Sequence, residues 1–142
     1  MATWSEAADP SDLSLSALIG DRSDMKWDDV LAIGLRLPGM EASTSYGTPA
    51  LKVRGRLVTR LRAEDDSLVL LGVVQEEREM LIGMDPAIFH TTPHYQGYQA
   101  VLARLAPLEA EQLRPFLVRR WQALAPKRVV ASFMASQGRR AN

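Results

Sequence analysis

The sequence of 142 residues contains no cysteine, and this absence excludes several kinds of site. Without thiols the chain forms no disulfide bond, has no thiol nucleophile and binds neither an iron–sulfur cluster nor a cysteine-ligated zinc ion. No hydrophobic run approaches the roughly 20 residues that a membrane-spanning helix needs. The first residues also lack the basic and apolar regions of a signal peptide, so we expect a cytoplasmic protein with no membrane partner.

Signatures of catalysis are also scarce. The hydroxyl residues Ser43–Ser45 stand in a row, but no G-x-S-x-G elbow surrounds them. The glycines are isolated and show neither Walker nor dinucleotide spacing. We therefore expect no catalytic residues, no cofactor and a role other than that of an enzyme.

The sequence has only two histidines, and both fall in one segment. His90 and His94 have the four-residue spacing of a helical metal pair, but Pro93 lies between them and the segment does not read as a helix. No third ligand is evident nearby. The sequence thus predicts no metal site, and loop histidines that anchor the backbone are the simpler interpretation.

A surplus of either charge is missing too, since 17 basic residues balance 17 acidic ones. The charges are nevertheless segregated along the chain. Residues 52–62 contain five basic residues and no acidic one, and residues 112–142 contain seven basic residues and no acidic one. The two remaining blocks, 1–51 and 63–111, are acidic. Such a chain either presents separate basic and acidic faces or pairs its blocks with one another.

The composition is that of one folded domain, with 46% hydrophobic and 24% charged residues in 15.7 kDa. Periodicity predicts a helix over 25–37, strands within 44–73, a helix over 75–82, a strand over 98–105 and a helix over 113–124. This order is typical of an α+β fold, an antiparallel sheet packed with helices. We expect a flexible tail over 1–24, the domain over 25–133 and a frayed basic tail over 134–142.

The basic block 52–62 alternates with apolar residues, which predicts a hairpin. A three-residue loop, Arg54 to Arg56, would pair Val53 with Leu57 and Leu51 with Thr59. That register buries Leu51, Val53, Leu57 and Leu61 and leaves Lys52, Arg60 and Arg62 on the opposite face. A two-residue turn of Arg54 and Gly55 would place arginine among the core residues, so we expect the odd-numbered loop.

Three stretches together carry a resemblance. They are Leu37–Arg56 (LPGMEASTSYGTPALKVRGR), Thr92–Tyr98 (TPHYQGY) and Trp121–Arg128 (WQALAPKR). Their content, order and spacing resemble the MmcQ/YjbR-like family of small bacterial proteins over about residues 27–130. The resemblance implies a sandwich similar to that of secretion chaperones and a DNA-binding role, and it brings no catalytic residues. The segment before Met25 extends beyond the shorter members of the family.

Two groups of residues are candidate sites. A basic ribbon suits phosphates or the major groove, so the candidate DNA-binding residues are Lys52, Arg54, Arg56, Arg60, Arg62, Lys127 and Arg128. Aromatic side chains of the resembling stretches are candidates for a ligand or partner groove, namely Tyr46, His94, Tyr95, Tyr98 and Trp121. In each case the alternative is purely structural: a solvated sheet face, or rings that seal the sheet against a helix.

Three functions follow from these candidates. The first is a DNA-binding protein that uses the basic hairpin. The second is a protein-interaction module, which a chaperone-like fold would suit. The third is a small-molecule-binding protein that uses the segment of tyrosines and histidine.

Overall fold

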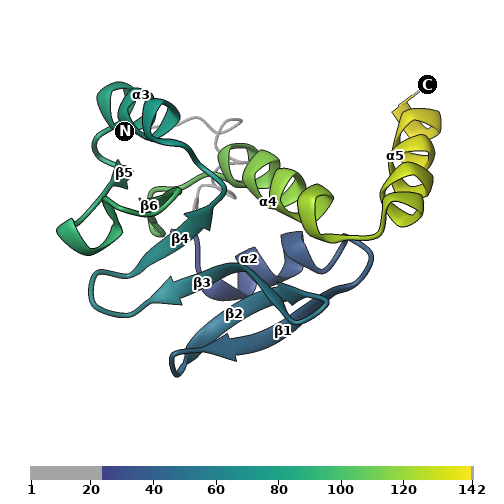
Figure 1. Ribbon diagram of the computed structural model, residues 1–142, viewed down its shortest axis with the longest axis horizontal. Helices are drawn as coiled ribbons and strands as arrows, with labels where there is room; N and C mark the ends of the chain where they lie inside the picture. The colour runs from purple at the N-terminus through teal and green to yellow at the C-terminus, as the bar shows by residue number, and fades with distance from the viewer. Residues whose placement is uncertain (1–23, 142) are drawn as a thin grey trace, which may run out of the picture.

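A computed structural model describes residues 24–141, and the protein is an α+β fold built on one antiparallel sheet (Figure 1). The six strands lie in the order β1-β2-β3-β4-β6-β5. Their bounds are β1 Met40–Ser45, β2 Thr48–Val53, β3 Arg56–Arg62, β4 Ser67–Leu71, β5 Phe89–His90 and β6 Ala100–Arg104. The predicted fold class is confirmed.

Helices pack on one face of the sheet, as Figure 1 shows for α4. The helices are α2 Trp27–Gly34, α3 Gln75–Met84, α4 Ala110–Leu124 and α5 Lys127–Ala141, with a 3-10 turn η2 at Pro93–Tyr95. α2 contacts β2, α4 contacts β3 and β4, and α3 lies beside β5 and β6. Within residues 24–141, the opposite face of the sheet has no long helix over it, and only the segment around η2 covers part of it.

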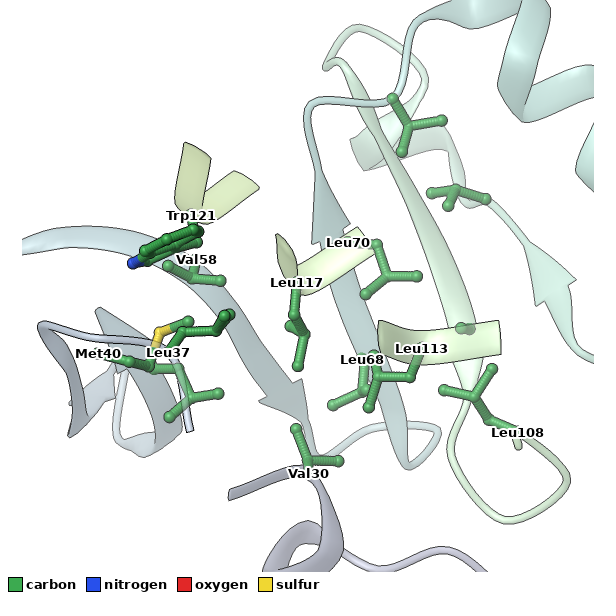
Figure 2. Packing of buried hydrophobic residues seen from close by; sticks show 14 of the residues in the cluster. Val30, Leu37, Met40, Val58, Leu68, Leu70, Leu108, Leu113, Leu117 and Trp121 are labelled. Atoms are coloured by element: carbon green, nitrogen blue, oxygen red, sulfur yellow. The ribbon is translucent and has the colours of Figure 1, made fainter. Parts of the chain in front are cut away.

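The core lies between this helical layer and the sheet. Leu113, Leu117 and Trp121 recur on one face of α4 and are at most 1% exposed, which follows from their helical spacing. They meet Val58 of β3 and the β4 side chains Leu68 and Leu70 (Figure 2). Burying each such side chain contributes about 1.5–3 kcal/mol, so this layer supplies much of the stability of the fold.

α5 continues the chain past the end of the predicted final helix. After Pro126 it runs to Ala141, so the predicted tail over 134–142 is helical as far as the structure describes it. Phe133 packs edge-on against Trp121 with 5.3 Å between ring centroids. The predicted tail over 1–24 lies outside the described residues, apart from Asp24.

The tip of the β2–β3 hairpin differs from the prediction. Val53 pairs with Arg56, so the turn contains only Arg54 and Gly55. Both have positive φ, 56° and 77°, as a type I′ turn requires. The predicted pairing of Val53 with Leu57 is therefore wrong, whereas Leu51 does pair with Thr59.

A β-bulge explains how an even-numbered turn still leaves the arginines outside the core. Lys52 pairs with Leu57 and Leu51 pairs with Thr59, so Val58 is an extra residue in β3. Val58 and Thr59 are both buried, at 1% and 0% exposure. Val58 thus takes the core position predicted for Leu57, and Leu57 faces the side of the sheet that carries Arg60.

The turn geometry generates a first prediction. Gly55→Ala should lower the free energy of unfolding by about 1–2 kcal/mol, because a side chain disfavours the left-handed backbone. An added Cβ would meet no atom within 4 Å, so the loss would come from the backbone alone. Urea denaturation measures it. Gly97→Ala is the control: its backbone is not left-handed and its surroundings are also open, so its change should stay below about 0.5 kcal/mol. Equal losses in both variants would contradict the assignment of the turn.

Candidate functional site

The sheet face turned away from α4 carries a groove of about 850 Å³. It runs along β3 and β4, from the β1–β2 turn at Tyr46 to Gly72 at the end of β4. We call it the tyrosine groove, and the lining residues that matter below are Tyr46, Leu57, Arg60, Tyr95, Tyr98 and Arg120. Its volume lies in the range of pockets that hold small molecules.

The segment around η2 forms one wall of the tyrosine groove. Tyr95 is 7% exposed and packs on Val69 and Leu102 of the sheet. The rings of His94, Tyr95 and Tyr98 meet edge-to-face, with centroids 4.8–5.7 Å apart. Such packing of rings fixes their orientation. The structure thus brings together Tyr46, His94, Tyr95 and Tyr98, four of the five aromatic residues predicted to share a groove.

The other wall is the β1–β2 turn, where Tyr46 has an unusual backbone. Its φ is +52°, and Gly47 follows with φ +78°, so this turn is also of the I′ kind. Asparagine, aspartate and glycine are preferred at such positions, and a bulky residue there is strained. The Tyr46 side chain is nevertheless 87% exposed and gains little from burial.

Arg60 lies in the tyrosine groove between these walls. Its Nη2 donates to the Tyr95 hydroxyl at 2.9 Å, and its guanidinium carbon lies 5.1 Å from the centre of the Tyr46 ring. A cation over a ring face is attracted by the ring quadrupole. Weaker bonds join Nη1 to Thr48 Oγ1 and to the carbonyl of Leu61. No carboxylate within residues 24–141 comes within 4.0 Å of it.

Arg120 reaches the groove from the helical layer. The ladder between β3 and β4 stops at Thr59 and Leu70, because the N–H of Gly72 donates to the carbonyl of Gln99 instead. The Leu57 carbonyl is left to accept Nε–H of Arg120 at 3.1 Å. Burial, and secondly the positive charge of Arg56, lower the pKa of Arg120, although a guanidinium remains protonated at neutral pH. This cation likewise has no carboxylate within 4.0 Å among the described residues.

The segment that carries the tyrosines is held by one buried arginine. Arg78 of α3 is 6% exposed. Its Nη1 donates to the carbonyls of Tyr95, Tyr98 and Ala100 at 2.9–3.3 Å, and its Nη2 donates to the carbonyl of Gln96 at 3.1 Å. These bonds satisfy backbone carbonyls at the edge of the core, and the Tyr95 carbonyl also accepts the N–H of Tyr98, so the backbone of the groove wall is fixed.

A serine, a histidine and an aspartate lie together near the start of β4, but they do not form a catalytic triad. Ser67 Oγ lies 2.9 Å from Nε2 of His90. Asp65 Oδ2 approaches the same Nε2, at 3.7 Å, so it cannot orient the ring through Nδ1 as a triad requires. Ser67 is also fully buried and out of reach of a substrate. The cluster is a structural network.

The predicted basic residues divide between two places. Arg62 donates to Asp65 at 2.6 Å and has only 17% of its side chain exposed, and Arg60 lies in the tyrosine groove. Arg62 is paired with an aspartate from the turn after β3. Arg60 keeps an unpaired charge among residues 24–141, but it lies in the groove beside Tyr95 rather than on an open sheet face. Both lie off the core, as predicted, but each is only partly exposed.

The remaining cations gather at the other end of the sheet, where the β2–β3 hairpin turns. Arg56 lies close enough to Arg120 to affect its pKa. Arg128 lines a shallow hollow together with Pro38. Pro38 lies two residues before Met40, the first residue of β1, and Met40 pairs with Val53 at the hairpin tip. We call this region the basic end, and it comprises Lys52, Arg54, Arg56, Arg120, Lys127 and Arg128. None of the six has a carboxylate within 4.0 Å in residues 24–141, and Glu41 is the cross-strand neighbour of Lys52.

Trp121, which was predicted to share the groove, lies instead in the core. It is fully buried on the helical side of the sheet, and its Nε1–H donates to the carbonyl of Pro38 at 2.7 Å. Its place among the apolar positions of α4 explains this burial. Arg78 and Arg120 were missed by sequence reasoning. Arg78 is one of two basic residues in an acidic block, and Arg120 lies next to Trp121 in a basic block.

The described part of the chain contains no group of three or more histidine, cysteine, aspartate or glutamate side chains that could hold a metal ion. Among its helices, none is long and apolar enough to cross a membrane.

Comparison with known proteins identifies relatives in mycobacteria. The chain is 35% identical to the uncharacterised protein Rv2570 of Mycobacterium tuberculosis strain H37Rv, over 126 residues that cover 79% of this chain and 98% of the relative. The same values hold for the uncharacterised protein Mb2600 of Mycobacterium bovis. The chain belongs to this family. No family model matches the chain, and no solved structure matches it.

The clamp formed by Arg78 generates a second prediction. Arg78→Met should lower the free energy of unfolding by about 3 kcal/mol or more, because four carbonyls lose their bonds to one buried guanidinium together, and only that of Tyr95 also accepts a backbone N–H outside the helices and strands. Arg104→Met is the matched control: Arg104 also donates to two carbonyls, those of Pro86 and Ala87, but it is exposed to water. Chemical denaturation of the control should show a change below about 1 kcal/mol. Similar decreases for both variants would mean that the clamp adds no stability of its own.

His90 generates a third prediction, on pH. Burial first, then the positive charge of Arg104, lower the pKa of His90 below 6.5, while Asp65 opposes this. The unfolded chain therefore binds a proton at a pH where the folded protein does not, and stability falls as the pH drops below about 6.5. Urea denaturation at about pH 7.5 and about pH 5.5 measures this loss of stability. The loss should be smaller in His90→Gln than in the wild type, because the contributions of the carboxylates are the same in both proteins and cancel in the comparison. A steeper fall in the variant would contradict the direction of the shift.

Proposed function

We propose that this protein binds DNA through its basic end and acts as a binding protein rather than as an enzyme. The observation that carries the proposal is the gathering of six cations with no carboxylate within 4.0 Å, among residues 24–141, at one end of a protein whose net charge is zero. In a neutral protein such segregation gives one region a positive potential, and a polyanion is the partner that this potential favours.

The accessibility of these cations supports contact with phosphates. Arg54, Arg56, Lys127 and Arg128 are exposed, so a strand can reach them without any change in the fold. Arginine at the tip of a two-stranded ribbon offers two parallel N–H donors to a phosphate or to a guanine edge. Exposed charges add little to stability, so their gathering here is better explained by a partner.

The backbone at Arg54 gives an independent argument. This residue occupies the first central position of a type I′ turn with φ +56°, where asparagine, aspartate or glycine is favoured. An arginine there costs stability relative to asparagine. Function is a reason for keeping a charged side chain at such a position, and phosphate binding is the function that fits it.

The resemblance to the MmcQ/YjbR-like family is part of this proposal. Two of the three stretches that carry it contain five of the six cations of the basic end, namely Lys52, Arg54, Arg56, Lys127 and Arg128. A DNA-binding role for members of that family would thus fall on the same surface as the charge argument.

The test is a titration of labelled duplex DNA at several salt concentrations. The double variant Arg54→Asn/Arg56→Gln should bind about tenfold more weakly at about 50 mM salt. The slope of log K against log salt should also become shallower by about 0.9 for each phosphate that the variant no longer neutralises. Thermal stability should not decrease, because asparagine suits the turn at position 54.

The matched control is Lys26→Gln/Arg104→Gln, which removes two charges at the opposite end of the sheet. Arg104 pairs with Ser67, and the N–H of Met25 donates to the carbonyl of Ala106, so both changes lie away from the hairpin tip. This control should bind like the wild type. If both double variants weaken binding equally, the effect depends on net charge alone and not on the basic end. If the wild type does not bind duplex DNA at about 50 mM salt, a DNA-binding role is refuted.

A further inference from the structure

The tyrosine groove presents two kinds of group to a ligand. One kind is cationic: Arg60 and Arg120 line it without a carboxylate within 4.0 Å in residues 24–141. The other kind is aromatic: the Tyr46 and Tyr98 side chains are 87% and 53% exposed at its edges. A ligand that satisfies both kinds carries a negative charge and a flat aromatic ring.

The two guanidinium groups are positioned rather than free. Arg60 is fixed by the Tyr95 hydroxyl and by the Tyr46 ring, and Arg120 is fixed by the Leu57 carbonyl. Within residues 24–141, Arg120 donates to a protein acceptor through its Nε–H alone. The N–H groups on both of its Nη atoms therefore remain for a ligand. A preorganised fork of this kind suits a phosphate, which accepts two N–H bonds at once.

The aromatic wall is also built in advance. Arg78 fixes the backbone from Tyr95 to Ala100, and the rings of His94 and Tyr95 brace that of Tyr98. On the facing wall, Tyr46 retains a strained backbone although its ring is almost fully in water. Strain without burial is explained if the ring stacks on a ligand.

From these observations we propose that the tyrosine groove binds a nucleotide unit, with the phosphate on Arg60 and Arg120 and the base stacked on Tyr46 or Tyr98. Stacking on tyrosine does not distinguish strongly between bases, so the groove accepts different ones. Arg120 belongs both to this groove and to the basic end. The unit is therefore either a free nucleotide or an unpaired nucleotide of a strand held by the basic end, and the second source rests on the proposed function.

The experiment compares adenosine 5′-monophosphate, adenosine and inorganic phosphate by calorimetry on the whole chain. The monophosphate should bind at least about tenfold more tightly than either part. Arg120→Gln should remove most of the advantage over adenosine, and Arg114→Gln should not, because Arg114 lies on the same helix but lines a hollow with Ile33 and Met134. Equal binding of all three probes, or no binding of any, would overturn the proposal.

Tyr46→Asn separates a ligand role from a structural one. Asparagine suits the left-handed backbone, so the variant should be at least as stable as the wild type, yet it should bind the monophosphate at least about fivefold more weakly. Tyr46→Phe should bind as the wild type does, because it keeps the ring. Wild-type affinity in Tyr46→Asn together with wild-type affinity in Tyr98→Ala would show that no base stacks on these tyrosines.

A second arm identifies the source of the nucleotide. A single-stranded DNA oligonucleotide of about ten nucleotides should bind more tightly than the monophosphate, and Tyr46→Asn should weaken it, if the groove takes a unit of a strand. Monophosphate binding with no such effect on the strand assigns the groove to the free nucleotide. If duplex DNA does not bind to the wild type but the monophosphate does, the DNA-binding role fails and the groove stands.

Discussion

One buried cation determines the shape of the face that we consider functional. Arg78 has no carboxylate within 4.0 Å among the described residues, and it is satisfied by four backbone carbonyls between Tyr95 and Ala100. A segment that directs so many carbonyls to one point cannot form a regular strand or helix there. Only arginine offers five N–H donors in a plane, and this explains why lysine could not replace it. The wall of the tyrosine groove around η2, the end of β4 and the start of β6 all depend on the bonds that Arg78 makes.

The same segment opens the sheet. Because Gly72 donates to Gln99, β3 and β4 separate beyond Thr59 and Leu70, and the Leu57 carbonyl faces a gap. Arg120 fills it from the helical side. A charged group thereby passes from one layer of the fold to the other at the junction of the basic end and the tyrosine groove. Arg120 consequently belongs to both candidate sites.

The sequence predicted the order of elements well, because long apolar periodicities such as that of α4 dominate local structure. It failed at Val58, since two adjacent apolar residues in a strand do not reveal which one is the extra residue of a bulge. It left Trp121 open between a groove and a core, because an aromatic residue next to basic ones is compatible with both, and the structure places Trp121 in the core. It missed Arg78 and Arg120, because an arginine whose partners are distant carbonyls leaves no local pattern in the chain.

The bulge at Val58 also determines how relatives of this protein should align. Val58 and Thr59 are both buried, so a chain without Val58 would keep Leu57 and Arg60 on the groove side and lack only one core side chain. A one-residue gap is therefore tolerable at this point of β3. The same gap between Thr59 and Arg62 would exchange the two faces of the rest of the strand and carry an arginine into the core. Variation in length along this hairpin should be confined to the bulge and the turn.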